Sequence, residues 1–310
     1  MAARVAVAVV SWNTRDLLAT CLESMHADAA AGLADVWVVD NGSADGSPEM
    51  VREAFPWVSL IEPERNLGYG PAINRVARET ASPWVVASNA DIELETGALT
   101  ALVAAGDADP GAGVIGPRLI LPDGSTQPGV QPYPGVLDGP LRNLSAHRIS
   151  RRVGERLYLE GFWDPGRAAV VDWVTGAFLL IRREVFDATG GFDERHWMYA
   201  EDLDLCWRAR RAGWRVRYEP AARVRHMLSV AAEQAFGDHE QRARRMLAED
   251  YAWLARRRGR GVAVATGVTQ VASLAARRAA LSIAGRPEKA AHVGQVLRRH
   301  LLVLPTALGR

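Results

Sequence analysis

Polar residues that could bind a ligand or take part in catalysis follow four short apolar runs within the first hundred residues. They are Ser11-Trp12-Asn13, residues 40–43 (Asp-Asn-Gly-Ser) with Asp45, residues 65–70 (Arg-Asn-Leu-Gly-Tyr-Gly), and Asn89-Ala90-Asp91. Taken singly, each cluster could serve only to form a turn. Ligands of an open parallel sheet bind beyond the carboxyl ends of its strands, so four such clusters in succession predict a binding site at one edge.

The fourth cluster could hold a divalent cation. Asp91 places one carboxylate at the tip of an apolar run, where it is suited to bind a metal ion against a diphosphate. One carboxylate is a poor metal site by itself. The diphosphate would supply several of the remaining oxygen ligands, and another ligand could come from later in the chain.

A second acidic cluster could supply a general base. Glu201, Asp202 and Asp204 lie in the first turn of a helix predicted over residues 201–212. Acidic residues at this position commonly stabilise a helix through its dipole, which is one interpretation. Apolar residues between the carboxylates give the helix a buried face, so one carboxylate could be fixed at the lip of a cleft and accept a proton from a substrate.

The elements that would position these residues alternate between strand and helix. Buried strands are predicted over residues 5–10, 36–39, 57–61 and 84–87. Helical spacing follows over residues 17–25, 47–55 and 72–80. This alternation is typical of βαβ units, so the first hundred residues should form a parallel sheet covered on both faces, in an α/β fold.

The second half of the chain is less regular. Residues 119–127 contain the turn signal Pro-Asp-Gly, and residues 129–166 lack any periodicity, which predicts an excursion of loops. A long strand is predicted over residues 170–181, followed by a short helix and the turn Gly190-Gly191. After residues 217–220 the chain is predicted to be helical to its end, apart from a strand-like stretch at 223–225.

Composition and glycine patterns exclude several classes of protein. The chain has 310 residues, 48% of them hydrophobic, which is enough for one large or two modest domains. Ten Trp argue against disorder, and two Cys are too few for a disulfide framework, so a reducing compartment is expected. The chain lacks Gly-x-Gly-x-x-Gly after the first strand and Gly-x-x-x-x-Gly-Lys-Ser/Thr anywhere, which disfavours dinucleotide oxidoreductases and P-loop enzymes.

Charge is distributed unevenly along the chain. Residues 242–310 hold 14 basic and three acidic residues, a balance of +11, and residues 1–241 carry −10. The basic region predicts contact with the anionic inner face of the plasma membrane. The alternative is a set of solvated faces in a helical subdomain or a homodimer contact. Without interleaved aromatic residues, a nucleic-acid partner is not expected. The first apolar run is too short for a signal peptide, so the protein is expected in the cytoplasm.

A series of motifs in this order resembles family 2 glycosyltransferases of the GT-A fold. The motifs are Val-Ser-Trp-Asn, Val-Asp-Asn-Gly-Ser-x-Asp-Gly, Asn-x-Gly-Tyr-Gly-x-x-x-Asn, Asn-x-Asp, Thr-Gly-Ala, Gly-Gly-Phe-Asp-Glu and Glu-Asp-x-Asp-Leu-x-x-Arg. They span about residues 5–226 and are most similar to the bacterial rhamnosyltransferase branch. The resemblance implies a mixed sheet flanked by helices over residues 1–230, with a donor-binding half to about residue 118 and an acceptor and catalytic half from 119. A helical, Arg-rich extension would occupy residues 231–310.

The resemblance also implies an activity. The protein would be an inverting transferase that moves a sugar from a nucleotide-diphospho-sugar to a hydroxyl of a saccharide or lipid-linked acceptor, in the synthesis of cell wall, polysaccharide or glycolipid. The best candidate for the sugar is L-rhamnose from dTDP-rhamnose, and the expected cofactor is Mg²⁺ or Mn²⁺. Two alternatives are a nucleotidyltransferase that makes a nucleotide-sugar and an inactive module that binds one. The first lacks its Gly-rich basic loop here, and the retained Glu201-Asp202 pair argues against the second.

Site residues follow from the positions that match the family's motifs. The nucleotide and donor would contact Ser11, Asn13, Asp40, Asn41, Asn66, Gly68, Asn89 and Asp91. Asp202 would be the catalytic base, with Glu201, Thr175 and Gly176 on the acceptor side, and the metal would bind Asp91 and His226. One departure is Asn89, which stands where the family's Asp-x-Asp motif has its first carboxylate.

Overall fold

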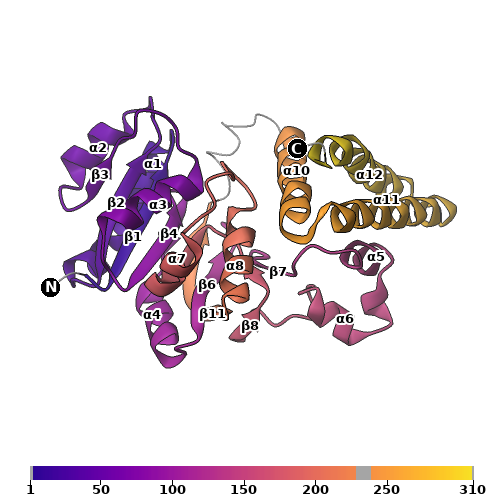
Figure 1. Ribbon diagram of the computed structural model, residues 1–310, viewed down its shortest axis with the longest axis horizontal. Helices are drawn as coiled ribbons and strands as arrows, with labels where there is room; N and C mark the ends of the chain where they lie inside the picture. Colours follow the sequence, from indigo (N-terminus) through magenta and orange to yellow (C-terminus); the bar gives the residue numbers. More distant parts are fainter. Residues whose placement is uncertain (1–2, 228–238, 309–310) are drawn as a thin grey trace. The chain divides into compact units, whose positions relative to one another are not determined.

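The computed structural model describes residues 3–227 and 239–308, which divide into two compact units (Figure 1). The first unit contains the described residues up to Gln131 and those from Pro165 to 227. The second contains Pro132–Asp164 and the helices that begin at His239. The irregular excursion therefore groups with the C-terminal helices, whereas the boundary expected near residue 230 would leave it with the sheet.

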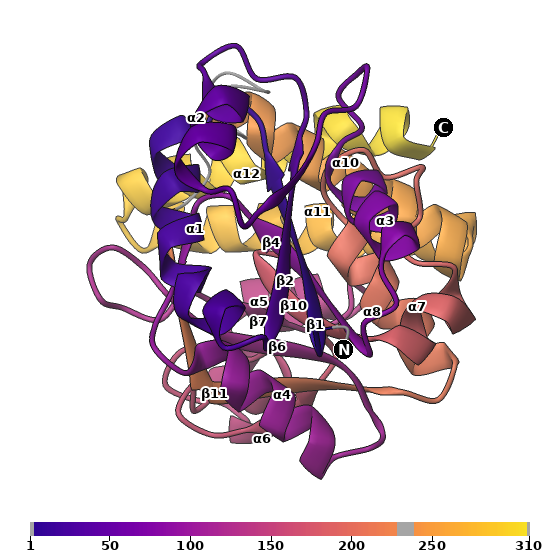
Figure 2. The ribbon, with the colours of Figure 1, turned by 90° about the vertical axis from the view of Figure 1, so that its left-hand side faces the viewer.

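The first half of the sheet is parallel, as predicted from its buried β-branched runs. Its strands lie in the order β3-β2-β1-β4 and are β1 (Val5–Ser11), β2 (Ala34–Asp40), β3 (Ser59–Ile61) and β4 (Trp84–Asn89). The connecting helices are α1 (Arg15–Ala30), α2 (Ser47–Ala54) and α3 (Tyr69–Glu79). Figure 2 shows α1 and α2 on one face of these strands and α3 on the other, so both faces are covered.

The second half of the sheet mixes strand directions. Strand β10 (Phe178–Arg182) lies antiparallel between β4 and β6 (Ala112–Ile120), and β11 (Arg215–His226) runs parallel to β6. Strand β5 (Ile92–Leu94) forms the edge, antiparallel to β11, and α4 (Ala98–Ala108) follows it. The sequence patterns identified neither β5, α4 nor β6. Two glycines and a proline within β6 weaken its strand signal.

The single strand predicted over residues 170–181 is wrong. The run is divided into β8 (Ala169–Val171), β9 (Trp173–Val174) and β10, with a turn at residues 176–177. Strand β8 pairs with β11, and β9 pairs with β7 (Val130–Gln131) in a separate two-stranded sheet. Most of the run is apolar in all three parts although they pair with different strands, so hydrophobicity alone does not mark the breaks.

The predicted start of the helical region after residues 217–220 is also wrong, because β11 continues to His226. Pro220 lies within a shift of register between Glu219 and Arg223. A proline cannot donate to the hydrogen-bond ladder, and such an irregularity accommodates it. The extra length of β11 carries His226 to the edge formed with β5.

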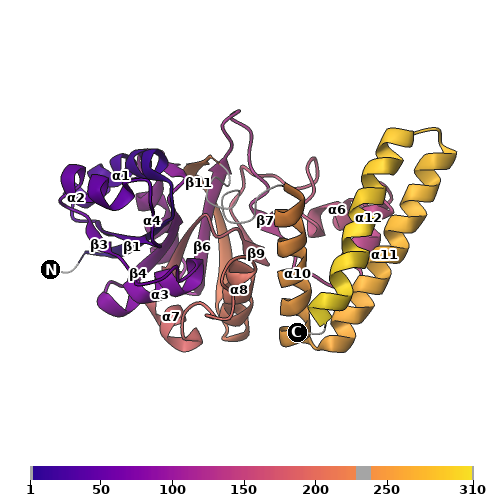
Figure 3. The same cartoon turned by 90° about the horizontal axis from the view of Figure 1, so that it is seen from above.

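Buried side chains between the sheet and α1, α2 and α4 form the hydrophobic core of the first unit. Alternate residues of β1, Val5, Val7 and Val9, are fully buried on this face. The opposite face carries α3, α7 (Arg183–Thr189) and α8 (Glu201–Arg211), as Figures 2 and 3 show from two directions. With helices over both faces, the polar residues that follow the strands are placed at the carboxyl-terminal edge of the sheet.

The second unit is helical. It contains α5 (Asp138–Asn143), α6 (Arg151–Arg156), α10 (His239–Arg258), α11 (Arg260–Ile283) and α12 (Pro287–Leu308), where α11 and α12 lie side by side (Figure 3). Hydrogen bonds join the excursion to α11: Asn143 Nδ2 donates to Ser273 Oγ at 3.0 Å and to Gln270 Oε1 at 3.3 Å, and Thr269 Oγ1 donates to the Val136 carbonyl at 2.7 Å. Within the described parts of the chain, no helix is both long and apolar enough to span a bilayer.

Candidate active site

Hydrogen bonds connect the loop after β1 to the loop after β2. The last residues of the two strands, Ser11 and Asp40, are paired in register. The backbone N–H of Asn13 donates to Ser43 Oγ at 2.8 Å, and Asn13 Oδ1 accepts the Ala44 N–H at 2.7 Å. Asn13 adopts a left-handed backbone with φ of 52°, which Asn tolerates better than most residues. The first two predicted clusters therefore form one fixed surface.

Buried Asp40 organises its own turn. Its Oδ1 accepts the N–H groups of Gly42 and Ser43 at 3.1 and 2.7 Å, and its Oδ2 accepts the Ser43 hydroxyl at 2.7 Å. A carboxylate that accepts several hydrogen bonds is held in one orientation. Ser11, also buried, shares a hydrogen bond of 3.1 Å between its hydroxyl and that of Thr14.

Asn41 connects this surface to the third predicted cluster. Its Oδ1 accepts the Leu67 N–H at 3.0 Å, and its Nδ2 donates to the Gly68 carbonyl at 3.2 Å. Asn66 completes the turn by accepting the Gly68 N–H at 2.9 Å. Gly68 has φ of 85°, and a Cβ there would lie 2.3 Å from the Trp197 carbonyl oxygen. Only glycine fits this close approach.

The fourth cluster meets the end of β11. His226 pairs with Ile92 in the β5–β11 ladder, and Ile92 directly follows Asp91 in the chain. His226 Nε2 lies 3.3 Å from Asp91 Oδ1 and 3.4 Å from Asn89 Nδ2. Asp91 and His226 are both buried. The structure thus brings the two predicted metal ligands together although they are far apart in sequence.

Asp202 is held by two backbone donors. Its Oδ2 accepts the Gly176 N–H at 2.7 Å, and its Oδ1 accepts the Leu203 N–H at 2.7 Å. Burial raises the pKa of Asp202 above its ordinary value, and these two hydrogen bonds act in the opposite direction. A raised pKa makes the carboxylate a stronger proton acceptor at neutral pH.

Residues 175–177 connect the three parts of the site. The Gly176 carbonyl accepts the Tyr69 hydroxyl at 2.5 Å, and the Ala177 carbonyl accepts the Asn89 N–H at 2.9 Å. Thr175 is fixed by its N–H, which donates to the Gly129 carbonyl at 2.8 Å. This short segment therefore contacts Tyr69 at the start of α3, Asn89 at the end of β4 and, through the Gly176 N–H, the Asp202 carboxylate at the start of α8.

Tyr69 is a residue that the sequence reasoning missed. Its phenol is buried, and its pKa is raised well above the ordinary value by that burial and by the negative charges of Glu201, Asp202 and Asp91. The carboxylates of the predicted base and metal sites therefore both act electrostatically on one hydroxyl group. The signal in the sequence was only a tyrosine between two glycines.

Strained backbone precedes the helix that carries Asp202. Tyr199 and Ala200 both adopt left-handed conformations, with φ of 73° and 64°. Such a conformation costs of order 1–3 kcal/mol for a residue other than glycine and persists where the surroundings impose it. No sequence pattern distinguishes these two positions, so the sequence reasoning missed them as well.

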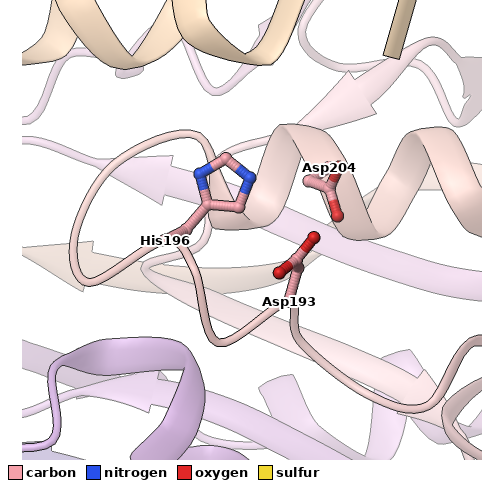
Figure 4. Close-up of side chains that lie close together, drawn as sticks. All are labelled: Asp193, His196 and Asp204. Atoms are coloured by element: carbon pink, nitrogen blue, oxygen red, sulfur yellow. The ribbon is translucent and has the colours of Figure 1, made fainter. Parts of the chain in front are cut away.

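A further polar cluster joins α8 to the loop that precedes it. Figure 4 shows Asp193 and His196 from the preceding loop and Asp204 from α8 pointing toward one another, with ligand atoms within 4.8 Å. Asp204 forms an ion pair of 2.6 Å with Arg208, and Asp193 pairs with Arg195, which holds the pKa of Asp193 far below its usual range. Arginines already supply positive charge to both carboxylates, so we interpret the cluster as joining the loop to the helix.

Known proteins match this arrangement. The family model for glycosyltransferase like family 2 matches residues 2–262. An N-acetylglucosaminyl-diphospho-decaprenol L-rhamnosyltransferase of Mycobacterium tuberculosis is 36% identical over 202 residues, which are 62% of this chain and 66% of that protein, just under two thirds of its length. A rhamnosyltransferase of Escherichia coli is 47% identical over 57 residues, 18% of this chain and 22% of that protein.

A solved structure supports the fold. A mannosyltransferase from Pyrobaculum calidifontis, solved in complex with GDP-Man and Mn²⁺, aligns with a TM-score of 0.61 over 98% of this chain and 86% of its own, at 19% identity. The mixed sheet flanked by helices is therefore a GT-A fold, as predicted. Because the family model matches most of its length, the chain belongs to the glycosyltransferase-like family 2.

Proposed function

We propose that the protein is an inverting glycosyltransferase that moves L-rhamnose from dTDP-rhamnose to a hydroxyl group of a lipid-linked saccharide. Support for the sugar and the acceptor comes from the name of the M. tuberculosis relative. The observation that carries the proposal is the segment 175–177, which contacts the Asp202 carboxylate, the Tyr69 hydroxyl and the backbone of Asn89. A base, a donor loop and a metal-binding strand thereby share one edge of the sheet.

The residues at the end of β4 fit a divalent cation. Neighbouring ligands about 2.1 Å from an octahedral metal are about 3 Å apart, close to the 3.3 Å between Asp91 Oδ1 and His226 Nε2. Asp91 and His226 would hold the ion, and Asn89 beside them adds an amide in place of a second carboxylate. When bound, Mg²⁺ or Mn²⁺ supplies stabilisation of the negative charge that develops on the leaving diphosphate.

Asp202 would act as the general base. It accepts the proton of the acceptor hydroxyl as that oxygen attacks the anomeric carbon from the face opposite the leaving group, so a single displacement inverts the configuration. Both of its oxygens are oriented by backbone N–H groups, which removes the need to order the side chain during the reaction. Its raised pKa improves its strength as a base.

Donor binding tests this function directly. Melting temperature is measured with dTDP-rhamnose, UDP- and GDP-sugars, each with and without Mn²⁺. We expect stabilisation by dTDP-rhamnose that requires the metal and is lost in Asp91→Ala, because the carboxylate links the cation to the protein. Asp107→Ala, a surface aspartate paired with Arg4, is the matched control.

Stabilisation that is independent of the metal, or equal in Asp91→Ala and the control, would contradict the metal assignment. A nucleotidyltransferase would instead release pyrophosphate from dTTP and rhamnose 1-phosphate. An inactive module would bind the donor but transfer no sugar to any acceptor.

The helical unit would bring the enzyme to its lipid-linked acceptor. One face of α11 exposes apolar side chains: Val264 is 43%, Val268 58% and Ile283 89% exposed. The helix contains no acidic residue, and residues 239–308 carry 13 basic against four acidic residues. A second copy of so cationic a unit would be repelled, whereas an anionic lipid surface matches both the charge and the apolar face.

A further inference from the structure

We propose that Gln127 is a positioning residue that fixes the tautomer of His226 and thereby prepares Nε2 to bind the cation. The proposal rests on the metal-dependent function above and adds a residue outside all of the motifs on which that function is based. The side-chain oxygen Oε1 of Gln127 lies 2.8 Å from His226 Nδ1, on the side of the ring away from Asp91.

The chemistry of an amide oxygen assigns the proton. Oε1 of Gln127 can only accept a hydrogen bond, so Nδ1 of His226 must carry the hydrogen. The other ring nitrogen, Nε2, then presents its lone pair toward Asn89 Nδ2 at 3.4 Å and Asp91 Oδ1 at 3.3 Å. A lone pair beside a carboxylate oxygen is an arrangement that a cation between them stabilises.

The position of Gln127 is set by a hairpin that extends β6. Its N–H donates to the Leu119 carbonyl at 2.9 Å, and its own carbonyl accepts the Gly129 N–H at 2.7 Å. The hairpin is closed by the Pro-Asp-Gly turn, in which the Leu121 N–H donates to the Ser125 carbonyl at 2.8 Å. Gln127 is thus fixed through its backbone before its side chain meets the histidine.

The histidine is fixed independently from the other side. Strand β11 pairs with β6 at Arg225 and Ile120, and it pairs with β5 at His226 and Ile92. The Met227 N–H also donates to the Asp91 carbonyl at 2.9 Å. The ring therefore lies between the strand that leads from Asp91 and the hairpin that carries Gln127, which leaves the site of the ring proton as the remaining variable.

Loss of Gln127 would favour the opposite tautomer. With no acceptor at Nδ1, the proton is more stable on Nε2, where it donates to the Asp91 carboxylate. That hydrogen bond would occupy both proposed metal ligands at once. Partners of this kind typically change metal affinity by about 10–100-fold when they are removed.

Three variants separate the role of the amide from a general effect on the fold. Gln127→Glu retains an acceptor and should keep the tautomer, whereas Gln127→Leu removes it. Gln131→Leu is the matched control, because Gln131 lies four residues further along and its amide bonds the Pro128 carbonyl at 3.3 Å. Circular dichroism and melting temperature verify that each variant is folded.

The first measurement is the ¹⁵N NMR spectrum of histidine-labelled, metal-free protein at about pH 8, above the usual histidine pKa of about 6.5. The His226 resonances are identified by their loss in His226→Asn. We expect Nδ1–H in wild type, Gln127→Glu and Gln131→Leu, and Nε2–H in Gln127→Leu. The second measurement is Mn²⁺ affinity by calorimetry, where Gln127→Leu should bind about 10–100-fold more weakly and the other two variants should match wild type.

An Nε2–H tautomer in wild type would overturn the proposal, since the amide would then be donating to Nδ1 through its NH₂ group. Gln127→Glu, which can only accept a hydrogen bond, would in that case move the proton to Nδ1 and bind Mn²⁺ more tightly than wild type. Unchanged tautomer and Mn²⁺ affinity in Gln127→Leu would overturn it equally. If wild type binds no Mn²⁺, the metal assignment of the proposed function fails with it, whereas normal wild-type binding with an unaffected Gln127→Leu variant refutes only the role of Gln127.

Discussion

Asp202 is the residue on which the proposed chemistry depends most directly. Asp202→Asn conserves the shape of the side chain but removes the ability to accept a proton, so turnover should fall by roughly 10²–10⁴-fold, the usual contribution of a positioned base. Donor binding should persist, because the contacts proposed for the nucleotide lie on other loops. Rhamnosyl transfer and donor-induced stabilisation are measured in parallel, with Asp107→Asn as the control. Near-normal turnover in Asp202→Asn would show that another group acts as the base.

The raised pKa of Asp202 gives the wild-type enzyme a pH signature. The base is active only when ionised, so kcat should decline as pH falls through the raised pKa, at a pH above the ordinary aspartate value of about 3.9. For stability the sign is reversed: a carboxyl group with a raised pKa favours folding below its unfolded pKa and loses that contribution as pH rises through the folded one. A kcat profile whose acid limb lies at the ordinary value would contradict the burial of an active base.

Single residues were predictable where they follow a strand and were missed where the fold joins distant segments. Asp40 and Asp91 could be selected because a polar residue after an apolar run stands out, and Asp202 because it lies in the acidic first turn of a predicted helix. Tyr69 and Gln127 could not, because each acts through a partner 107 or 99 residues away in sequence. The contacts exist only after the strands that carry them have paired.

At the scale of the elements, Gly68 sets how closely the start of α3 approaches the loop before α8. A Cβ at Gly68 would collide with the Trp197 carbonyl oxygen, which also accepts the Tyr69 N–H at 3.1 Å. Gly68→Ala should therefore displace both segments and abolish donor-induced stabilisation. Gly97→Ala is the control, since Gly97 has φ of 81° and open space around its Cα.

Gly97→Ala carries the cost of a left-handed alanine, of order 1 kcal/mol. Gly68→Ala costs more, because φ of 85° with ψ of −172° is a conformation essentially confined to glycine, and it adds the collision. Urea unfolding should give a larger loss of stability for Gly68→Ala than for Gly97→Ala. Equal losses, with donor binding intact in both variants, would show that the two segments can move apart without consequence for the site.

Elements with their own periodicity were predicted, and those defined by their partners were not. The parallel strands β1 to β4 are buried on both faces and read as continuous apolar runs. The run at 170–181 looks the same, yet it divides among three partner strands. The extension of β11 past Pro220 depends on a change of register against β6, which no local pattern encodes.

At the scale of the whole molecule, the cationic helical unit should bind anionic vesicles through the exposed face of α11. Val268→Glu places a charge on that face and removes a buried valine from the bound state, worth about 1.5–3 kcal/mol, so vesicle affinity should fall at least about tenfold. Gln295→Glu, on an exposed part of α12, adds the same charge without the loss of apolar surface. Flotation with phosphatidylglycerol vesicles at increasing salt measures the effect.

Transfer to a water-soluble acceptor should be unchanged in both variants, because the site lies in the other unit. Equal flotation of Val268→Glu and Gln295→Glu would show that α11 does not enter the lipid surface. A point variant is a sharper test than removal of residues 242–310, because that removal would also take away α11, which packs against α5. The uneven charge predicted the basic region, but charge does not reveal that residues 132–164 belong with it.

The grouping of residues 132–164 with the C-terminal helices also sets an order of events on the ribosome. Asn143 is translated 130 residues before Ser273, its hydrogen-bond partner on α11. At about 5–20 residues per second, the excursion waits roughly ten seconds for the helix that covers it. Leu137 and Leu144 are exposed even in the folded protein, and during that interval the apolar side chains that α11 later covers are exposed to solvent as well. The nascent chain therefore offers chaperones an apolar binding segment between the two halves of the sheet while the sheet is folding.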